Sequence, residues 1–199
     1  QTTNSGASWM GRHPGGSYYG ANFYGVDFLD PTNGWISGYN VVLATTNGGE
    51  SWAARNTGLP VNQSWYDIDF FNSQTGWVCG SMGVARTVDG GLNWSSLFTP
   101  TGSNLRAVHF VDSDNGWAAG TGFLLKTTNG GVNWAYVMTP SNGMSWRDVV
   151  FLDPTNGWAC GQKDLIIKTT NSGATWQLVT GTPMPTTLYL YSMCWPDAT

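Results

Sequence analysis

Aspartates are the residues of this sequence best suited to acid–base chemistry. The chain has 12 acidic side chains among its 199 residues, and Glu50 is its only glutamate. Two carboxylates on opposite sides of a cleft can hydrolyse a glycosidic bond, and the candidates for such a pair are Asp67, Asp69 and Asp148. All three fall on short apolar segments, on the side opposite the Val and Phe positions. We expect ordinary polar contacts from them and predict no catalytic residue.

The sequence offers little for a metal or a redox centre. Its two histidines are His13 and His109, its three cysteines are Cys79, Cys160 and Cys194, and it has no Cys-x-x-Cys pair. An odd number of cysteines does not indicate a disulfide framework. Cys79 and Cys160 stand at the same position of two sequence repeats, so we expect them to be small buried side chains that lie apart. We therefore predict no metal site and no cofactor.

Composition indicates a protein of many short strands. Charged residues make up 10% of the chain and aromatic residues 14%, and there are 27 glycines. Long helices draw on Glu and Lys, which are scarce here, so an α-rich fold is disfavoured. The net charge of −4 gives no reason to expect nucleic acid, which needs a basic surface. No apolar run is long enough for a membrane span. The Lys-poor, Asn- and Thr-rich composition favours an exported protein, extracellular or on the cell surface, with a periplasmic or lumenal location as the alternative.

A repeat of about 41 residues runs through the whole chain. Five segments share the pattern Thr-x-Asn/Asp-x-Gly-x-x-Trp and end at Trp9, Trp52, Trp94, Trp134 and Trp176. A Gly-Trp motif follows the same period, at Trp35, Trp77, Trp117 and Trp158. An apolar segment precedes each Gly-Trp motif and starts at Val26, Ile68, Val108 and Val149. Residues 191–199 start one more copy, with Trp195 in place of Phe.

Each period predicts four short antiparallel strands, which is the pattern of a propeller blade. One such sheet cannot bury both of its faces, so neighbouring blades must stack, and the repeated tryptophans supply the apolar area. We predict an all-β chain, a β-propeller of four-stranded antiparallel blades in a single domain, residues 1–199. The expected repeats are 1–23 in part, 24–65, 66–104, 105–146, 147–188, and 189–199 in part.

The repeat pattern begins at the end of a third strand and stops after a first strand. We expect four complete blades with parts of a fifth and a sixth. A two-strand deficit would leave sheet edges exposed. The alternatives are a fragment of a larger ring, a ring closed by a partner chain within a larger complex, and an incomplete five-bladed ring.

The five tryptophan-ended segments match the Asp box, which bacterial neuraminidase repeats and several other propeller families share. With the pattern Phe-x-Asp/Asn-x-x-x-Gly-Trp-x-x-Gly that precedes them, they most resemble the repeats of the photosystem II stability/assembly factor family, also found in secreted bacterial surface proteins. The resemblance covers essentially the whole chain. It implies a propeller and a basic, arginine-bearing patch that meets a membrane-protein client. Arg106 and Arg147 start equivalent strands in two repeats, whereas Tyr24, Tyr66 and Tyr191 hold that place in the others.

Residues outside the repeat pattern are the better candidates for function, because activity on propellers is carried by loops. They gather in the connections from the box strand to the next first strand, which should meet on one rim. Aromatic side chains beside Asn, Ser and Arg suit a protein or a sugar surface. The candidate rim residues are Tyr19, Trp65, Tyr66, Arg106, Trp146, Arg147 and Tyr191. The alternative is that half of these alternating side chains pack between blades.

These observations favour a non-enzymatic, exported module that binds or scaffolds another macromolecule through its loop rim. The expected partner is a protein or a glycan, with no nucleic acid and no membrane insertion. A lectin-like propeller that stacks sugars on aromatic rings is the second hypothesis. A fragment of an Asp-box glycosidase is the third, and it requires two carboxylates that face each other across an open cleft.

Overall fold

Each complete sequence repeat folds into one four-stranded antiparallel sheet. The computed structural model describes residues 2, 4, 6–12, 14, 18, 20–97, 99, 104–141, 143–163, 165–179 and 189–194. The first blade consists of β1 (Phe23–Phe28), β2 (Gly34–Gly38), β3 (Val41–Thr45) and β4 (Ala53–Ala54). The second consists of β5 (Trp65–Phe70), β6 (Gly76–Gly80), β7 (Gly83–Thr87) and β8 (Ser95–Leu97). The third consists of β9 (Leu105–Phe110), β10 (Asn115–Gly120), β11 (Phe123–Thr128) and β12 (Ala135–Val137). The fourth consists of β13 (Trp146–Phe151), β14 (Gly157–Gly161), β15 (Ile166–Thr169) and β16 (Gln177–Leu178).

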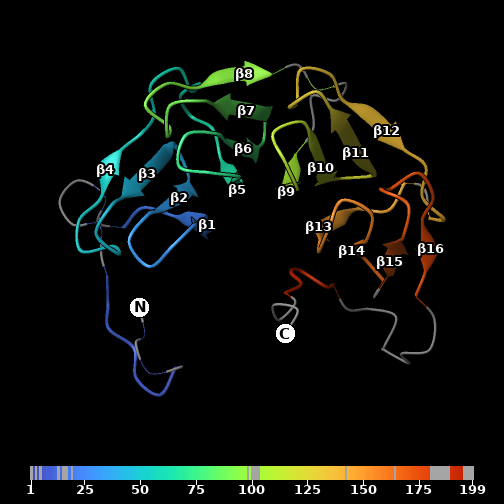
Figure 1. The fold of residues 1–199 in the computed structure, drawn as a ribbon, viewed down its shortest axis with the longest axis horizontal. Coiled ribbons are helices and arrows are strands. Elements are labelled where there is room, and N and C mark those ends of the chain that lie inside the picture. The colour runs from blue at the N-terminus through green and yellow to red at the C-terminus, as the bar shows by residue number, and fades with distance from the viewer. Residues whose placement is uncertain are drawn as a thin grey trace.

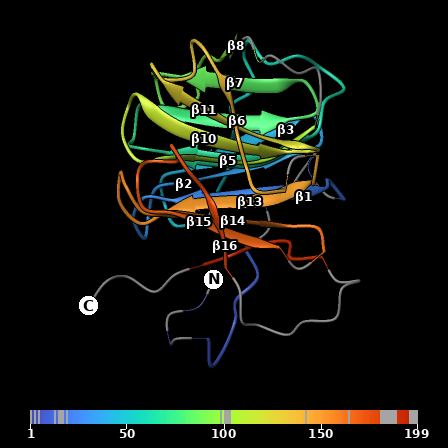
Figure 2. The same ribbon diagram turned by 90° about the vertical axis from the view of Figure 1, so that its right-hand side faces the viewer.

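The four blades stand side by side along an arc, with β1, β5, β9 and β13 on its inner side (Figure 1). Seen from the side, the strands of successive blades cross the molecule in layers (Figure 2). The innermost strands of neighbouring blades contact each other. The predicted all-β propeller of four-stranded blades is therefore confirmed. No helix in the described ranges is long and apolar enough to span a bilayer.

Residues 189–194 continue the pattern beyond the fourth blade. Tyr189 forms an antiparallel bridge with Gln162, just as Ser64 bridges Tyr39 where the chain enters the second blade. The backbone N–H of Met193 donates to Asp148 Oδ2 at 2.6 Å. These residues therefore lie beside β13, in the place of the innermost strand of a further blade.

The Asp box closes the outer hairpin of each blade with local hydrogen bonds. In the second blade, the hydroxyl of Thr87 donates to Asp89 Oδ1 at 2.8 Å and accepts the backbone N–H of Gly91 at 2.9 Å. Asp89 Oδ1 also accepts the backbone N–H of Asn93 at 2.8 Å. Gly90 and Gly91 have φ of 70° and 87°, in the left-handed region that favours glycine. The carboxylate of Asp89 is therefore occupied by hydrogen bonds within its own turn.

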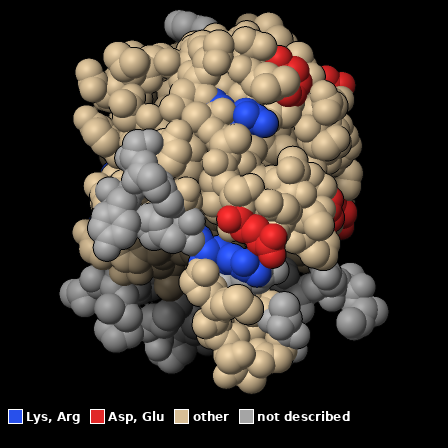
Figure 3. Space-filling model, turned by 90° about the vertical axis from the view of Figure 1, so that its left-hand side faces the viewer, with Lys and Arg blue, Asp and Glu red and all other residues tan. Residues whose placement is uncertain are grey.

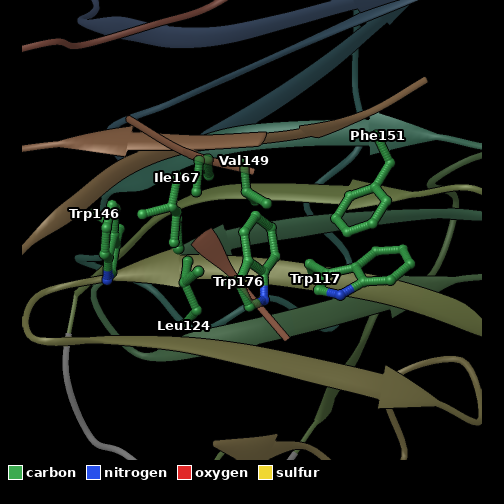
Figure 4. Packing of buried hydrophobic residues seen from close by; sticks show 10 residues of the cluster. Trp117, Leu124, Trp146, Val149, Phe151, Ile167 and Trp176 are labelled. Atoms are coloured by element: carbon green, nitrogen blue, oxygen red, sulfur yellow. The ribbon is translucent and has the colours of Figure 1, made fainter. Parts of the chain in front are cut away.

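Tryptophans and phenylalanines hold neighbouring blades together. Trp77 of the second blade stacks on Phe110 of the third, with ring centroids 3.5 Å apart and planes 4° apart. Trp134 meets the same phenylalanine at 85°. The indole N–H of Trp77 donates to the carbonyl of Gly130 at 3.0 Å. The next interface repeats this ring packing with Trp117, Phe151 and Trp176 (Figure 4), although the indole N–H of Trp117 has no hydrogen-bond partner among the described residues.

The glycine of each Gly-Trp motif makes this stacking possible. Phe70 and Gly76 are cross-strand partners in the second blade, and a Cβ on Gly76 would lie 2.6 Å from the Phe70 ring. The phenylalanine ring therefore lies flat over the glycine and presents its other face to Trp35 of the first blade, 3.7 Å away. The expected packing role of the repeated tryptophans is confirmed at all three interfaces between described blades.

Candidate binding site

The second residue of each innermost strand lines one pocket on the inner side of the arc. This axial pocket has a volume of about 310 Å³ and is lined by Phe23, Tyr24, Tyr66, Arg106, Arg147 and Tyr191. It therefore draws on β1, β5, β9 and β13 and on the segment 189–194. Because the lining residues come from every described inner strand, the pocket exists only when the blades are assembled.

A β-bulge places four of these side chains, those of Tyr24, Tyr66, Arg106 and Arg147. The cross-strand register of β5 shifts between Trp65 and Asp67, so Tyr66 has no partner of its own in the ladder. The register shifts in the same way around Tyr24 in β1 and around Arg147 in β13. A bulge bends the strand and re-aims the extra side chain. The bulges therefore direct the Tyr and Arg side chains to the pocket.

The tyrosine and arginine side chains contact each other around the pocket. The rings of Tyr24 and Tyr66 are 5.5 Å apart, and the guanidinium carbon of Arg106 lies 4.3 Å from the Tyr66 ring centroid. The guanidinium carbon of Arg147 lies 5.5 Å from the ring centroid of Tyr191. Such cation–π contacts hold the two guanidinium groups against aromatic faces.

Both arginines keep hydrogen-bonding capacity that the described residues do not use. Nε of Arg106 and Nε of Arg147 are buried and have no hydrogen-bond partner within the described ranges. No acidic residue is among those that line the axial pocket. A buried donor without a partner costs free energy. An anionic group entering the pocket would pair with the two positive charges.

Two of the predicted rim residues are not accessible to a partner. Trp65 is 2% exposed and Trp146 is 1% exposed, and both belong to hydrophobic clusters between blades. The placement of these two indoles on a binding rim was wrong, because each side chain lies on the packing side of its bulge. The alternative, that alternate residues pack between blades, holds for both.

Four other predicted residues lie on the inner strands and on the segment 189–194, and not on the loops where they were expected. Tyr66, Arg106, Arg147 and Tyr191 all line the axial pocket. Tyr19 lies outside the described residues. Tyr24 also lines the axial pocket, but it was not among the predicted site residues. It stands at the same repeat position as Tyr66, and this alignment was the signal that could have identified it.

The strand aspartates link neighbouring blades. Asp67 Oδ2 accepts the backbone N–H of Val108 at 2.9 Å, and Asp69 Oδ2 accepts that of Phe110 at 2.7 Å. Burial raises the pKa of Asp67 to about 7 and that of Asp69 well above its ordinary value. Asp148 accepts a hydrogen bond from the backbone N–H of Met193 in the same way. Each of the three candidate carboxylates therefore binds a backbone N–H of the segment that follows on the inner side of the arc.

His109 takes the place of an aspartate in the third blade. Its Nε2–H donates to the carbonyl of Phe151 at 3.0 Å, and its Nδ1 lies 3.9 Å from Asp69 Oδ1. Burial lowers the pKa of His109, while burial raises that of Asp69. Both side chains are therefore favoured in their neutral forms, and they join three successive blades. Within the described ranges, no group of three or more His, Cys, Asp and Glu side chains could hold a metal ion.

Comparison with known proteins agrees with this architecture. Residues 54–143 match the family model of the photosynthesis system II assembly factor YCF48. The solved structure of YCF48 bound to D1 peptide is 16% identical, with a TM-score of 0.53 over 79% of this chain and 82% of that one. A search of the curated proteins gave no match.

Enzymes with the same architecture are also similar in fold. An ancestral GH74 enzyme is 22% identical, with a TM-score of 0.69 over 88% of this chain and 26% of its own. Virginiamycin B lyase from Staphylococcus aureus is 15% identical, with a TM-score of 0.69 over 83% of this chain and 57% of its own. At these identities the likeness shows the fold and nothing of the chemistry.

The fold and the repeated box turns define the class of this protein: it is a β-propeller built from Asp-box repeats. Within that class, residues 54–143 are similar to the photosystem II assembly factor YCF48.

Proposed function

We propose that this chain is a non-enzymatic, exported binding module that holds a segment of another protein in the axial pocket. The observation that carries the proposal is the pair of guanidinium groups of Arg106 and Arg147, which line an aromatic pocket that has no acidic residue among its lining. Guanidinium groups bind carboxylates and backbone carbonyls, and tyrosine rings add contact area at low entropic cost.

The comparison with YCF48 supports a protein partner, because that propeller was solved with a peptide bound. A non-enzymatic function is supported by the use of Asp67, Asp69 and Asp148 as hydrogen-bond acceptors for the next inner strand. Carboxylates that bind backbone N–H groups in this way differ from a glycosidase pair, whose two carboxyl groups face the substrate across a cleft. A location outside the cytoplasm rests on the Lys-poor, Asn- and Thr-rich composition.

The test is a selection of peptides from a random display library with the wild-type chain. We expect the selected peptides to carry acidic or C-terminal carboxylates and to lose at least about tenfold in affinity for the double variant Arg106→Gln, Arg147→Gln. Lys168→Gln is the matched control, because it removes a positive charge from an exposed side chain that does not line the pocket.

Two outcomes would contradict the proposal. One is binding of the selected peptides that the arginine variant leaves unchanged. The other is that the library yields no binding peptide while sugars on a glycan array bind the wild-type chain and no longer bind a Tyr66→Ala variant. That result would favour the lectin hypothesis. Far-UV circular dichroism of each variant shows whether the fold is kept.

A further inference from the structure

The residue directly before the Asp-box threonine is a cation in three of the four blades, namely Arg86, Lys126 and Lys168. In each blade this residue is the cross-strand partner of the tryptophan of the Gly-Trp motif. In the first blade the same position is held by Ala44, opposite Trp35. The first blade therefore lacks a charge that the other blades place beside this tryptophan.

In the second and third blades the cation lies over an indole ring. The guanidinium carbon of Arg86 is 5.4 Å from the ring centroid of Trp77, and Nζ of Lys126 is 5.3 Å from that of Trp117. Nζ of Lys126 also donates to the carbonyl of Ser172 in the box turn of the fourth blade, at 2.6 Å. The interface between blades thus contains a subsite that holds a cation between an indole face and a box-turn carbonyl.

The corresponding space beside Ala44 is a cavity between the first and second blades. Its volume of about 240 Å³ is smaller than the roughly 300–1,000 Å³ of pockets for drug-sized ligands, so it suits a single small group. Its lining includes Trp35 and Ala44 from the first blade and Asp89 and Gly90 from the second. The indole N–H of Trp35 donates to the carbonyl of Gly90 at 3.1 Å. The indole and the box turn that form the subsite are therefore both in place.

Two glycines show that this space is empty where the next interface holds a guanidinium. A Cβ on Gly130 would lie 2.7 Å from Nη1 of Arg86 and 2.9 Å from the carbonyl oxygen of Ser113. A Cβ on Gly90 would lie 2.9 Å from the carbonyl oxygen of Ser73, and apart from its chain neighbours no other described residue comes within 4 Å. The backbone surroundings therefore match, and the cation is missing from one of them.

The cavity has an acidic residue where the filled subsites have a neutral one. The box residue is Asp89 in the second blade, but Asn129 and Asn171 in the third and fourth. Hydrogen bonds from the backbone N–H and the side chain of Asn93 hold the pKa of Asp89 below its ordinary value. Its carboxylate is therefore negatively charged at neutral pH. Loss of a cation and gain of an anion at the same interface make the cavity complementary to a positively charged group.

Arg55 also lines the cavity, but it does not fill the empty subsite. Its Nη1 donates to the carbonyl of Ala54 at 3.1 Å. Its Cβ lies beside Gly91, 3.4 Å from where a Cβ on that glycine would be, whereas the empty subsite lies beside Gly90. Charged side chains are few on the side of the molecule where β4 lies (Figure 3). Arg55 and Asp89, the two charged residues of the described lining, therefore dominate the electrostatic field in the cavity.

We propose that the cavity between the first and second blades binds an organic cation, a primary ammonium or guanidinium group on a short alkyl chain. The cation lies over the ring of Trp35 and donates to the carbonyl of Gly90, and the carboxylate of Asp89 supplies the balancing charge. A free alkylamine and a Lys or Arg side chain of another protein present the same group. The cavity shares no lining residue with the axial pocket, so the two sites are independent.

The probes are n-butylammonium and the blocked peptide acetyl-Gly-Lys-Gly-amide, titrated into the ¹⁵N-labelled whole chain. The indole N–H resonance of Trp35 reports binding in NMR spectra. We expect a saturable shift of this resonance, and expect the same peptide with an acetylated, uncharged lysine to leave it unchanged. A shift with the amine and not with the peptide would identify a free amine as the ligand, and a shift with both would identify a side chain.

Two substitutions with opposite expected effects distinguish a cation site from other polar cavities. Asp89→Asn installs the residue found in the other boxes and should weaken binding at least about threefold. Arg55→Gln removes a neighbouring positive charge and should strengthen binding. Ala44→Lys places an ammonium group of the chain itself in the cavity and should abolish binding. Ala54→Lys is the matched control, because Ala54 is exposed and does not line the cavity.

Four results would overturn the proposal. They are the absence of a saturable shift with either probe, an equal response to the charged and the uncharged peptide, binding that Asp89→Asn leaves unchanged, and binding that Arg55→Gln weakens. The ¹⁵N spectrum of each variant shows whether the fold is kept.

Discussion

The carboxylate of Asp67 accepts a hydrogen bond from the backbone N–H of Val108 at 2.9 Å, across the boundary between the second and third blades. The same kind of bond joins Asp27 to Phe70 at 2.7 Å and Asp69 to Phe110 at 2.7 Å. These carboxyl groups connect neighbouring sheets that share no strand-to-strand ladder. Inter-blade cohesion on the inner side of the arc is therefore polar, whereas between the sheet faces it is aromatic.

The pKa of Asp67 makes stability depend on pH. Burial raises this pKa from 3.8 to about 7, so between pH 4 and 7 the folded chain binds more protons here than the unfolded chain. The contribution of Asp67 to the free energy of unfolding is therefore greatest below pH 4 and is lost as pH rises to 7. Asp67→Asn keeps an oxygen acceptor for Val108 and removes the charge. We expect it to stabilise the chain relative to wild type at pH 8, by up to a few kcal/mol at about 1.4 kcal/mol per pKa unit.

Urea unfolding of both chains at pH 4, 6 and 8 measures this difference. Asp153→Asn is the control of opposite sign, because hydrogen bonds from Thr155 and Asn156 hold the pKa of this exposed carboxyl below its ordinary value. Asp153→Asn should therefore lower the free energy of unfolding above pH 4, and this destabilisation should become smaller as the pH falls. A stability difference for Asp67→Asn that does not change with pH would contradict the role of the buried charge.

Substitution of a buried and of an exposed Asp-box tryptophan can show whether the motif stabilises the fold through packing between blades or only within its own turn. Trp94 is 4% exposed and its indole N–H donates to the carbonyl of Arg55 at 2.8 Å, whereas Trp9 is 74% exposed. We expect Trp94→Ala to lower the free energy of unfolding by about 3–5 kcal/mol. Trp9→Ala should change it by about 0.5 kcal/mol or less. Equal effects in chemical denaturation would mean that the motif acts within its own turn and not through blade packing.

Substitution of Gly76 tests whether the Phe70 ring needs the absence of a side chain at the glycine of the Gly-Trp motif. A methyl group at this position would lie 2.6 Å from the Phe70 ring and push it off Trp35. We expect Gly76→Ala to destabilise the fold by about 1–3 kcal/mol. Gly11→Ala serves as control, because no atom lies within 4 Å of the position that its methyl group would take. Thermal unfolding of the two variants gives the comparison, and a Gly76→Ala chain as stable as the control would refute the steric argument.

Thiol reactivity reports the burial of the cysteines. Cys79 and Cys160 are free and buried, and Cys194 is free and exposed. Burial raises the pKa of the Cys79 thiol well above its ordinary value and that of Cys160 to about 12. Because the thiolate is the reactive form, a thiol reagent at pH 8 should modify one cysteine of the native chain quickly. The other two should react only after unfolding in urea, and Cys194→Ser should abolish the fast phase.

The blades themselves follow from local sequence. The box turn of Thr87, Asp89 and Gly91 is closed by bonds between residues at most four apart, so a short motif is enough to specify it. The same is true of the pairing of Gly76 with Phe70, because a tight turn fixes the register of the two strands. The fold and the burial of Cys79 and Cys160 could therefore be predicted from the repeat.

Tertiary structure determines which side chains of the inner strands point into the core and which point to the axial pocket. Trp65 and Tyr66 are adjacent aromatic residues in the sequence, yet a bulge sends the first into the core and the second to the axial pocket. The alternation of apolar and polar residues at these two repeat positions was a signal that one of the two side chains packs between blades. The bond between Asp67 and Val108 likewise depends on how one blade lies against the next. Local patterns determine each sheet because the contacts within a sheet join residues close in sequence, whereas the axial pocket and the inter-blade hydrogen bonds join residues about one repeat or more apart.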